Sequence, residues 1–143
     1  MEDQLLKKII MKLTTYTDGG ARGNPGPAAL GVVIKNETGA TVAGYGIYLG
    51  EQTNNFAEYS ALISALEKAK ELGATEVHCI LDSELVTKQM NRQYKVRDPG
   101  LQKLFIKAYN AAQQFKKVTF THTLRANNKE ADAWVNDALD KQL

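Results

Sequence analysis

The sequence predicts one α/β domain built on a five-stranded mixed sheet: three antiparallel strands, then two strands parallel to the first, with helices on both faces. Two observations predict this fold class. Three segments rich in strand-forming residues follow one another with short turns between them, and helical and strand patterns alternate afterwards. The length of 143 residues, with 43% hydrophobic and 24% charged residues, is typical of one globular domain.

The first part of the chain predicts an antiparallel meander. Residues 12–17 alternate as a strand that delivers Asp18, and the four glycines and two prolines of residues 19–27 are expected to break it. Residues 30–35 and 41–49 predict the second and third strands. Short turns between consecutive strands favour antiparallel pairing.

A long amphipathic helix is expected after the meander. Apolar residues recur at helical spacing over residues 56–69, and Thr53 or Asn54 can cap the first amides. Glu58 is then expected in the first turn. Gly73 can adopt the left-handed conformation that ends the helix.

Strands and helices alternate in the rest of the chain. Residues 76–81 predict a fourth strand, covered on both faces and joined to the first by a right-handed crossover, so that the two strands are parallel. This strand ends at Asp82, and Ser83 can cap the next helix. The remaining elements are expected to be helices over 84–90 and 99–115, a strand over 117–124, and a last helix, capped by Asn127 or Asn128, to about residue 141.

Acidic residues fall where these elements begin or end, at Asp18, Glu58, Asp82 and Asp132. The first and fourth strands are expected to be parallel neighbours, so Asp18 and Asp82 can lie side by side. Acids gathered there would repel one another unless cations lie between them, and two divalent cations with oxygen ligands would satisfy the group. Each acid alone could be a turn residue or a partner of a helix dipole. The four together indicate a site.

Five motifs follow one another along the chain: Tyr16-Thr17-Asp18-Gly19-Gly20, Gly23-Asn24-Pro25-Gly26-Pro27, Thr53-Asn54-Asn55-Phe56-Ala57-Glu58, Asp82-Ser83 and Asn128-Lys129-Glu130-Ala131-Asp132. In this order they resemble type 1 ribonuclease H. The resemblance covers the chain from Met11 onward. It implies an N-terminal extension over residues 1–10 and a ribonuclease H domain over residues 11–143, of the compact kind without a basic protrusion.

The resemblance implies an endonuclease that hydrolyses the RNA strand of an RNA–DNA hybrid and leaves 5′-phosphate and 3′-hydroxyl ends. The catalytic, metal-binding quartet of the family carries over to Asp18, Glu58, Asp82 and Asp132. Its cofactors are two Mg2+ ions, with Mn2+ as a substitute. Two metals roughly 3.5–4 Å apart can activate a water and stabilise the leaving oxygen.

The resemblance also implies substrate contacts, from Gly19, Gly20, Ala21, Asn24, Thr53, Asn54 and Asn55. Neutral amides suit a 2′-hydroxyl, which both donates and accepts hydrogen bonds. The small residues 19–21 let the backbone approach the minor groove closely. Arg125, at a strand end, is the candidate for touching phosphate.

The chain departs from the family pattern in three places. Glu84 stands where many members have Gln, so it either weakens a base contact or faces solvent. Residues 91–100 lack a Lys- and Trp-rich cluster, which predicts weak, salt-sensitive hybrid binding. The loop before the fourth acid lacks the histidine of well-known bacterial members. His122 lies in the predicted strand, in phase with Phe120 and Leu124, and is expected to be packed rather than catalytic.

Two other functions are weighed against this one. A non-catalytic nucleic-acid-binding module of the same fold has no need for four clustered acids that repel phosphate. Another nuclease on this fold, such as an exonuclease or a resolvase, has no need for asparagines that contact 2′-hydroxyls. Both are therefore less favoured.

Composition indicates the cellular compartment in which the protein is expected to act. No apolar run approaches the roughly 20 residues that cross a bilayer, and the first residues do not resemble a signal peptide. The single cysteine, Cys79, excludes an internal disulfide and suits a reducing compartment. These features predict a cytoplasmic protein that does not bind a membrane. The resemblance implies an RNA–DNA hybrid as its partner, and we expect the protein to be a monomer. The net charge of +2 permits an anionic partner without requiring one.

Overall fold

The computed structural model describes residues 10–142, so the expected N-terminal extension lies outside the described residues except for Ile10. The elements along the chain are β1 (Lys12–Ala21), β2 (Gly26–Lys35), β3 (Thr41–Gln52), α2 (Asn54–Glu71), β4 (Glu76–Leu81), α3 (Glu84–Met90), α4 (Pro99–Ala112), β5 (Lys117–His122), the 3-10 helix η1 (Arg125–Asn127) and α5 (Lys129–Asp140).

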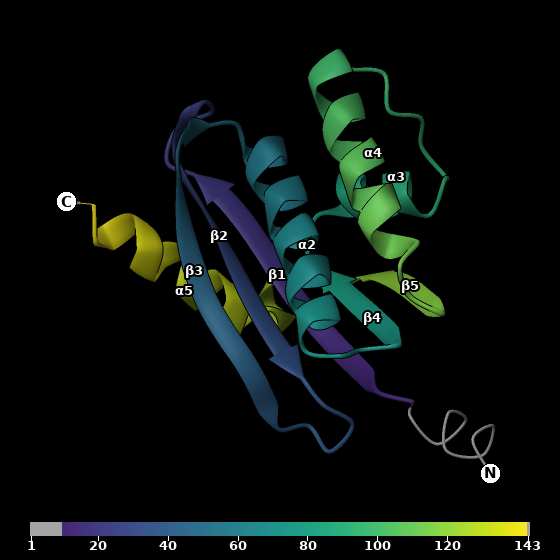
Figure 1. The fold of residues 1–143 in the computed structure, drawn as a ribbon. Coiled ribbons are helices and arrows are strands. Elements are labelled where there is room, and N and C mark those ends of the chain that lie inside the picture. The colour runs from purple at the N-terminus through teal and green to yellow at the C-terminus, as the bar shows by residue number, and fades with distance from the viewer. Residues whose placement is uncertain (1–9, 143) are drawn as a thin grey trace, which may run out of the picture.

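The strands form one five-stranded sheet in the order β3-β2-β1-β4-β5. β2 pairs antiparallel with both β1 and β3, whereas β4 runs parallel to β1 and β5 parallel to β4. Helices α2, α3 and α4 cover one face of the sheet, and α5 crosses the other face behind β1, β2 and β3 (Figure 1). The predicted fold class is confirmed.

The main core lies between the sheet and α2. Tyr59, Leu62 and Leu66 of α2 are fully buried there. A smaller apolar cluster on the opposite face contains Ala29 of β2 and three residues of α5, Val135, Ala138 and Leu139. Helix α5 lies very close to the sheet, because a Cβ on Gly31 of β2 would collide with the carbonyl oxygen of Ala131. Both helix layers are therefore fixed against the central strands.

Strand β1 is longer than the sequence predicts. It runs through Asp18 and the glycines that follow it as far as Ala21, which pairs with Ala28 of β2. The ladder to β2 supplies hydrogen-bond partners that local sequence does not reveal. The expected break comes four residues later, where the N–H of Arg22 donates to the carbonyl oxygen of Pro27 at 2.8 Å. The fourth strand stops opposite Thr17, so Asp18 lies one residue beyond the β1–β4 ladder.

Other boundaries differ by less. Strand β4 and helix α3 have the predicted limits, whereas α4 ends at Ala112 and β5 at His122. Glu58 lies in the second turn of α2 and not in the first, because the helix begins at Asn54 with Thr53 as its N-cap. Within residues 10–142, no helix is both long and apolar enough to cross a membrane.

Strand β4 is covered on one face only, which corrects the expectation of burial on both. Val77, Cys79 and Leu81 are buried under the helices, whereas His78 on the opposite face is exposed. The cause is the path of α5, which packs on β1, β2 and β3. Burial raises the pKa of the Cys79 thiol to about 12.

Candidate active site

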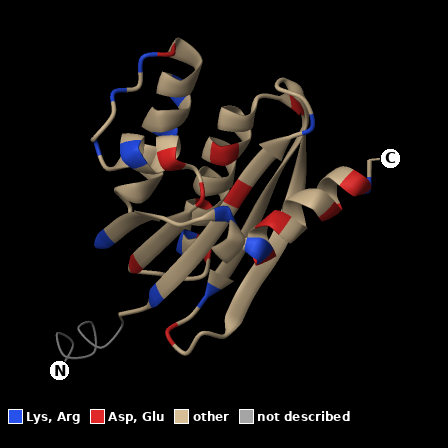
Figure 2. Cartoon of the chain, turned by 180° about the vertical axis from the view of Figure 1, so that it is seen from behind, with Lys and Arg blue, Asp and Glu red and all other residues tan. Residues whose placement is uncertain are grey.

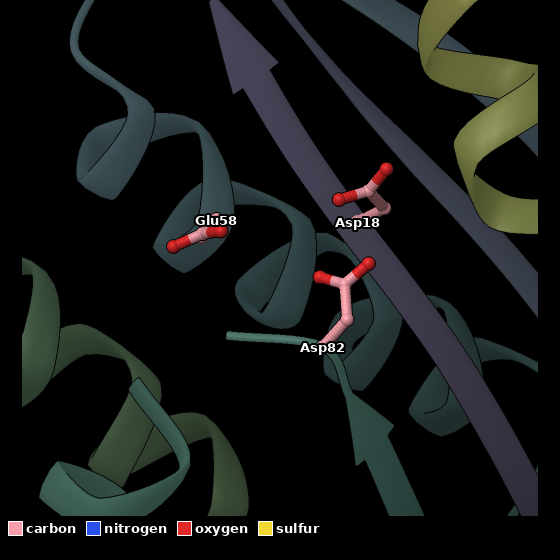
Figure 3. Close-up of side chains that lie close together, drawn as sticks. All are labelled: Asp18, Glu58 and Asp82. Atoms are coloured by element: carbon pink, nitrogen blue, oxygen red, sulfur yellow. The ribbon is translucent and has the colours of Figure 1, made fainter. Parts of the chain in front are cut away.

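Three of the predicted acids converge at the point where β4 ends. Asp18 comes from the central strand β1, Asp82 follows β4, and Glu58 comes from α2 (Figure 3). Each offers a carboxylate oxygen, and these oxygens lie within 4.8 Å of one another. Asp18 is the most enclosed of the three, with 5% of its surface exposed. This spacing and donor type suit a divalent cation that prefers oxygen ligands.

The fourth acid, Asp132, lies in the first turn of α5, as predicted. It lines the same cavity as Asp18 and Glu58, with a volume of about 430 Å³. The Nδ2 group of Asn136, one turn later, donates to Oδ2 of Asp132 at 3.3 Å. The structure therefore gathers all four predicted acids, three within one cluster and the fourth on the α5 side of it.

Gly19 sets how closely α2 approaches the central strand. A Cβ on Gly19 would collide with the backbone of Ala57 and Glu58, whereas a Cβ on Gly20 would lie 3.7 Å from the side chain of Val135. Only the first of these glycines is needed for packing. Gly19, which the sequence predicts to let the backbone approach the minor groove, is buried under α2 and brings Glu58 next to Asp18, and it also lines the cavity that holds the acids.

The acids perturb one another strongly. Burial, the charge of Asp82 and a hydrogen bond to Asp132 raise the pKa of Asp18 to about 8. Burial also raises the pKa of Glu58 to about 7, partly offset by a hydrogen bond with Ser83, while the charges of Asp82 and Arg125 make smaller, opposing contributions. Because these carboxyls are costly to ionise without a counter-charge, a cation that replaces their protons stabilises the ionised cluster.

Three predicted substrate residues are joined to one another. The N–H of Ala21 donates to Oδ1 of Asn54 at 2.8 Å, and the N–H of Asn54 donates to Oδ1 of Asn24 at 3.0 Å. These bonds fix the turn after β1 against the start of α2. They use the amide oxygens, so the Nδ2 groups can still donate to a ligand.

The remaining predicted substrate residues are distributed around the cavity. Gly20, Ala21, Asn54, Asn55 and Arg125 line it together with the acids. Thr53 is placed differently, because its hydroxyl oxygen accepts the N–H of Phe56 at 3.1 Å and caps α2. Arg22 also lines the cavity and was not predicted; it forms an ion pair with Asp140 at 2.7 Å.

Glu84 and His122, which bear on two departures from the family pattern, both lie on the surface. Glu84 is exposed and pairs with Lys88 at 2.8 Å, and this bond lowers the pKa of Glu84. His122 is the last residue of the edge strand β5 and is exposed, so the expectation that it is packed is wrong. Leu124, expected to share its buried phase, is 68% exposed. The alternation of half-buried and exposed side chains does not continue to Leu124 because β5 ends at His122.

The connection between α3 and α4 carries exposed positive charge. It has no tryptophan and is short, as expected, but Arg92, Lys95 and Arg97 are all exposed along it. Residues 88–107 contain six Lys or Arg and a single acid. Figure 2 shows these cations on the outer edge of the helical layer, separate from the acids at the sheet. We call residues 88–107 the basic segment.

Comparisons with known proteins identify the family. A family model described as reverse transcriptase-like matches residues 16–138. The chain is 43% identical over 129 residues to ribonuclease HI of Halobacterium salinarum, covering 90% of this chain and 65% of that protein. The crystal structure of RNase H1 from the same archaeon matches with a TM-score of 0.89 and 42% identity, covering 91% of this chain and 98% of that one. The chain belongs to the type 1 ribonuclease H family.

Two further relatives define how far the likeness extends. LC11-RNase H1, solved in complex with an RNA/DNA hybrid, is 45% identical with a TM-score of 0.87, covering 91% of this chain and 98% of that one. The bifunctional protein Rv2228c of Mycobacterium tuberculosis is 44% identical over 131 residues, which are 91% of this chain but 36% of that protein. This chain thus spans about a third of the mycobacterial relative, whose N-terminal RNase H domain has a solved structure that matches 92% of this chain.

Proposed function

We propose that this ribonuclease H is an endonuclease that hydrolyses the RNA strand of RNA–DNA hybrids and leaves 5′-phosphate and 3′-hydroxyl ends. The observation that carries the proposal is the acid cluster. Asp18, Glu58 and Asp82 offer oxygens within 4.8 Å of one another, and Asp132 lines the same cavity. The likeness to an RNase H1 that was crystallised with an RNA/DNA hybrid supports the choice of substrate.

The donor set fits Mg2+, with Mn2+ as a substitute. All donors are carboxylates, and burial raises the pKa of Asp18 to about 8 and of Glu58 to about 7, so a bare cluster is costly at neutral pH. Asp18, Glu58, Asp82 and Asp132 would hold two ions between them. Such a pair of ions supplies an activated water and stabilises the leaving oxygen.

The chain itself binds and orients the hybrid. The amide oxygens of Asn24 and Asn54 accept backbone N–H groups within the protein, so their Nδ2 groups are the atoms that can donate to sugar and phosphate oxygens. Arg125 lines the cavity and is assigned a phosphate contact. The basic segment adds a second, sequence-independent attraction for phosphate.

We also infer that one chain is sufficient and that it acts in a reducing compartment such as the cytoplasm. All four acids come from one chain, so the site needs no second copy. The thiol of Cys79 is buried and unpaired with any other cysteine.

The test is cleavage of a uniformly labelled RNA–DNA hybrid beside a DNA duplex, an RNA duplex and the single strands. We expect Mg2+-dependent cleavage within the RNA strand of the hybrid, with 5′-phosphate products, and no such cleavage by Asp18→Asn. Cleavage of the DNA duplex at a similar rate would refute the substrate assignment. Cleavage that survives in Asp18→Asn would refute the site.

A further inference from the structure

The side chain of Asn128 joins three elements of the site. Asn128 lies between η1 and α5 and is only 2% exposed. Its Nδ2 group donates to the backbone carbonyl oxygen of Thr17 at 2.8 Å and to Oδ2 of Asp82 at 3.2 Å. Thr17 and Leu81 form the last pair of the β1–β4 ladder, so Asn128 binds where this ladder ends.

An asparagine at a helix N-cap ordinarily accepts a backbone N–H of the first turn with its side-chain oxygen, whereas Asn128, the N-cap of α5, does not. Its backbone carbonyl accepts the N–H of Asp132 at 3.2 Å, so it also begins the turn that carries the fourth acid. Its Oδ1 is buried without a hydrogen-bond partner among residues 10–142, which is unfavourable for folding. The Asn128 side chain is therefore oriented so that Nδ2 makes two hydrogen bonds, although Oδ1 is left without a partner in the described part of the chain.

We propose that Asn128 is a positioning residue for the metal site: it holds the Asp82 carboxylate in its binding orientation and couples α5, with Asp132, to β1. The inference rests on the proposed function. A donor bond to Oδ2 restricts rotation of the carboxylate before a cation arrives, so less freedom is lost on binding. The second bond, to Thr17, fixes the amide itself next to Asp18.

The simpler alternative is that Asn128 only anchors α5 to the sheet. Under that alternative, replacing it lowers the stability of the metal-free protein but leaves the metal affinity of the folded protein unchanged. Under the proposal, metal affinity and turnover fall in the folded protein, whereas the KM for the hybrid changes little.

The experiment compares Asn128→Leu and Asn128→Ala with the control Ala138→Gly. Leucine keeps the branched arrangement of four side-chain heavy atoms but removes the donors and the unpaired oxygen, whereas alanine removes the same groups without adding bulk. Ala138 packs against Gly46 of β3, so Ala138→Gly weakens α5 without touching an acid. Each variant is titrated calorimetrically with Mn2+, melted with and without Mg2+, and assayed for kcat and KM on the hybrid.

We expect both Asn128 variants to bind Mn2+ about 10–100-fold more weakly and to show a smaller rise in melting temperature with Mg2+. Ala138→Gly should bind both ions as the wild type does. Wild-type metal affinity in the folded Asn128 variants would overturn the proposal, and so would failure of both to fold even with saturating Mg2+. A wild-type protein that binds metal but cleaves no hybrid would refute the proposed function while leaving this comparison valid.

Discussion

The acid cluster and the basic segment are built in opposite ways. Asp18, Glu58 and Asp82 come from a central strand and the elements packed on it, with oxygens within 4.8 Å. The cations of the basic segment are spread over two short helices and an exposed connection. The net charge of +2 hides this separation. Chemistry at a metal needs fixed geometry, whereas attraction to a polyanion needs only charge density, so the two regions should respond differently to substitution.

The largest effect is expected at the centre of the cluster. Asp18→Asn should abolish Mg2+-dependent cleavage, at least about 10³-fold, because Asp18 is the most enclosed of the three clustered carboxylates that we propose hold the ions. The same change should leave the metal-free melting temperature unchanged or raised, since it replaces a carboxyl whose ionisation is opposed by burial and by Asp82 with a group that does not ionise. Activity on the hybrid and thermal melting in EDTA check both expectations. Glu37→Gln, in the exposed turn between β2 and β3, is the matched control.

Near-normal activity in Asp18→Asn would show that the catalytic assignment is wrong. Loss of activity accompanied by a large fall in melting temperature would instead contradict the expectation that Asp18→Asn does not lower stability.

A neighbouring pair of glycines tests how rigid the cluster must be. Gly19→Ala should force α2 away from β1, lowering turnover by about 10–100-fold and stability by about 1–3 kcal/mol. Gly20→Ala should change both much less, because its Cβ meets only ordinary contact at 3.7 Å. Turnover and melting temperature of the two variants give the comparison. Equal effects would mean that α2 adapts and that the spacing of Asp18 and Glu58 is not critical.

The basic segment should tolerate geometric change but not loss of charge. Combined Arg92→Gln, Lys95→Gln and Arg97→Gln should raise the KM for the hybrid about 10-fold at low salt while kcat changes little. The wild-type KM should rise steeply with increasing salt concentration at fixed Mg2+, and the KM of the triple variant should rise less steeply. An equally steep response in both would show that these cations do not contact phosphate, and a flat wild-type response would point to an apolar binding surface.

The metal-free cluster should also make stability depend on pH. The folded pKa of Asp18 is about 8 and that of Glu58 about 7, both above their ordinary values of 3.8 and 4.5. A raised carboxyl pKa gives stability that is fully present below the unfolded pKa and is lost as pH rises through the folded pKa. In EDTA, the unfolding free energy should therefore fall by about 6 kcal/mol between pH 5 and 9, and by less than half of that in Asp18→Asn. Parallel curves for the two proteins would contradict this.

The two regions also differ in how well the sequence predicts them. Local patterns suffice for β4 and α3, whose limits are confirmed, and for the order of elements that brings the four acids together. The contribution of Gly19 depends on a helix 35 or more residues away, and that of Asn128 on strands far from it in sequence, so neither leaves a local signal. The extension of β1 depends in the same way on pairing with β2.

The smallest effect is expected at His122, which lies outside both regions. The sequence predicts a packed histidine whose loss would cost stability, but the side chain is exposed at the end of β5. His122→Ala should therefore change the unfolding free energy by less than about 0.5 kcal/mol and turnover by less than about twofold. Melting temperature and turnover measured on the same variant test this. A fall in turnover of about 10²-fold with an unshifted melting temperature would instead mean that His122 transfers a proton at the site, as a general acid or base can.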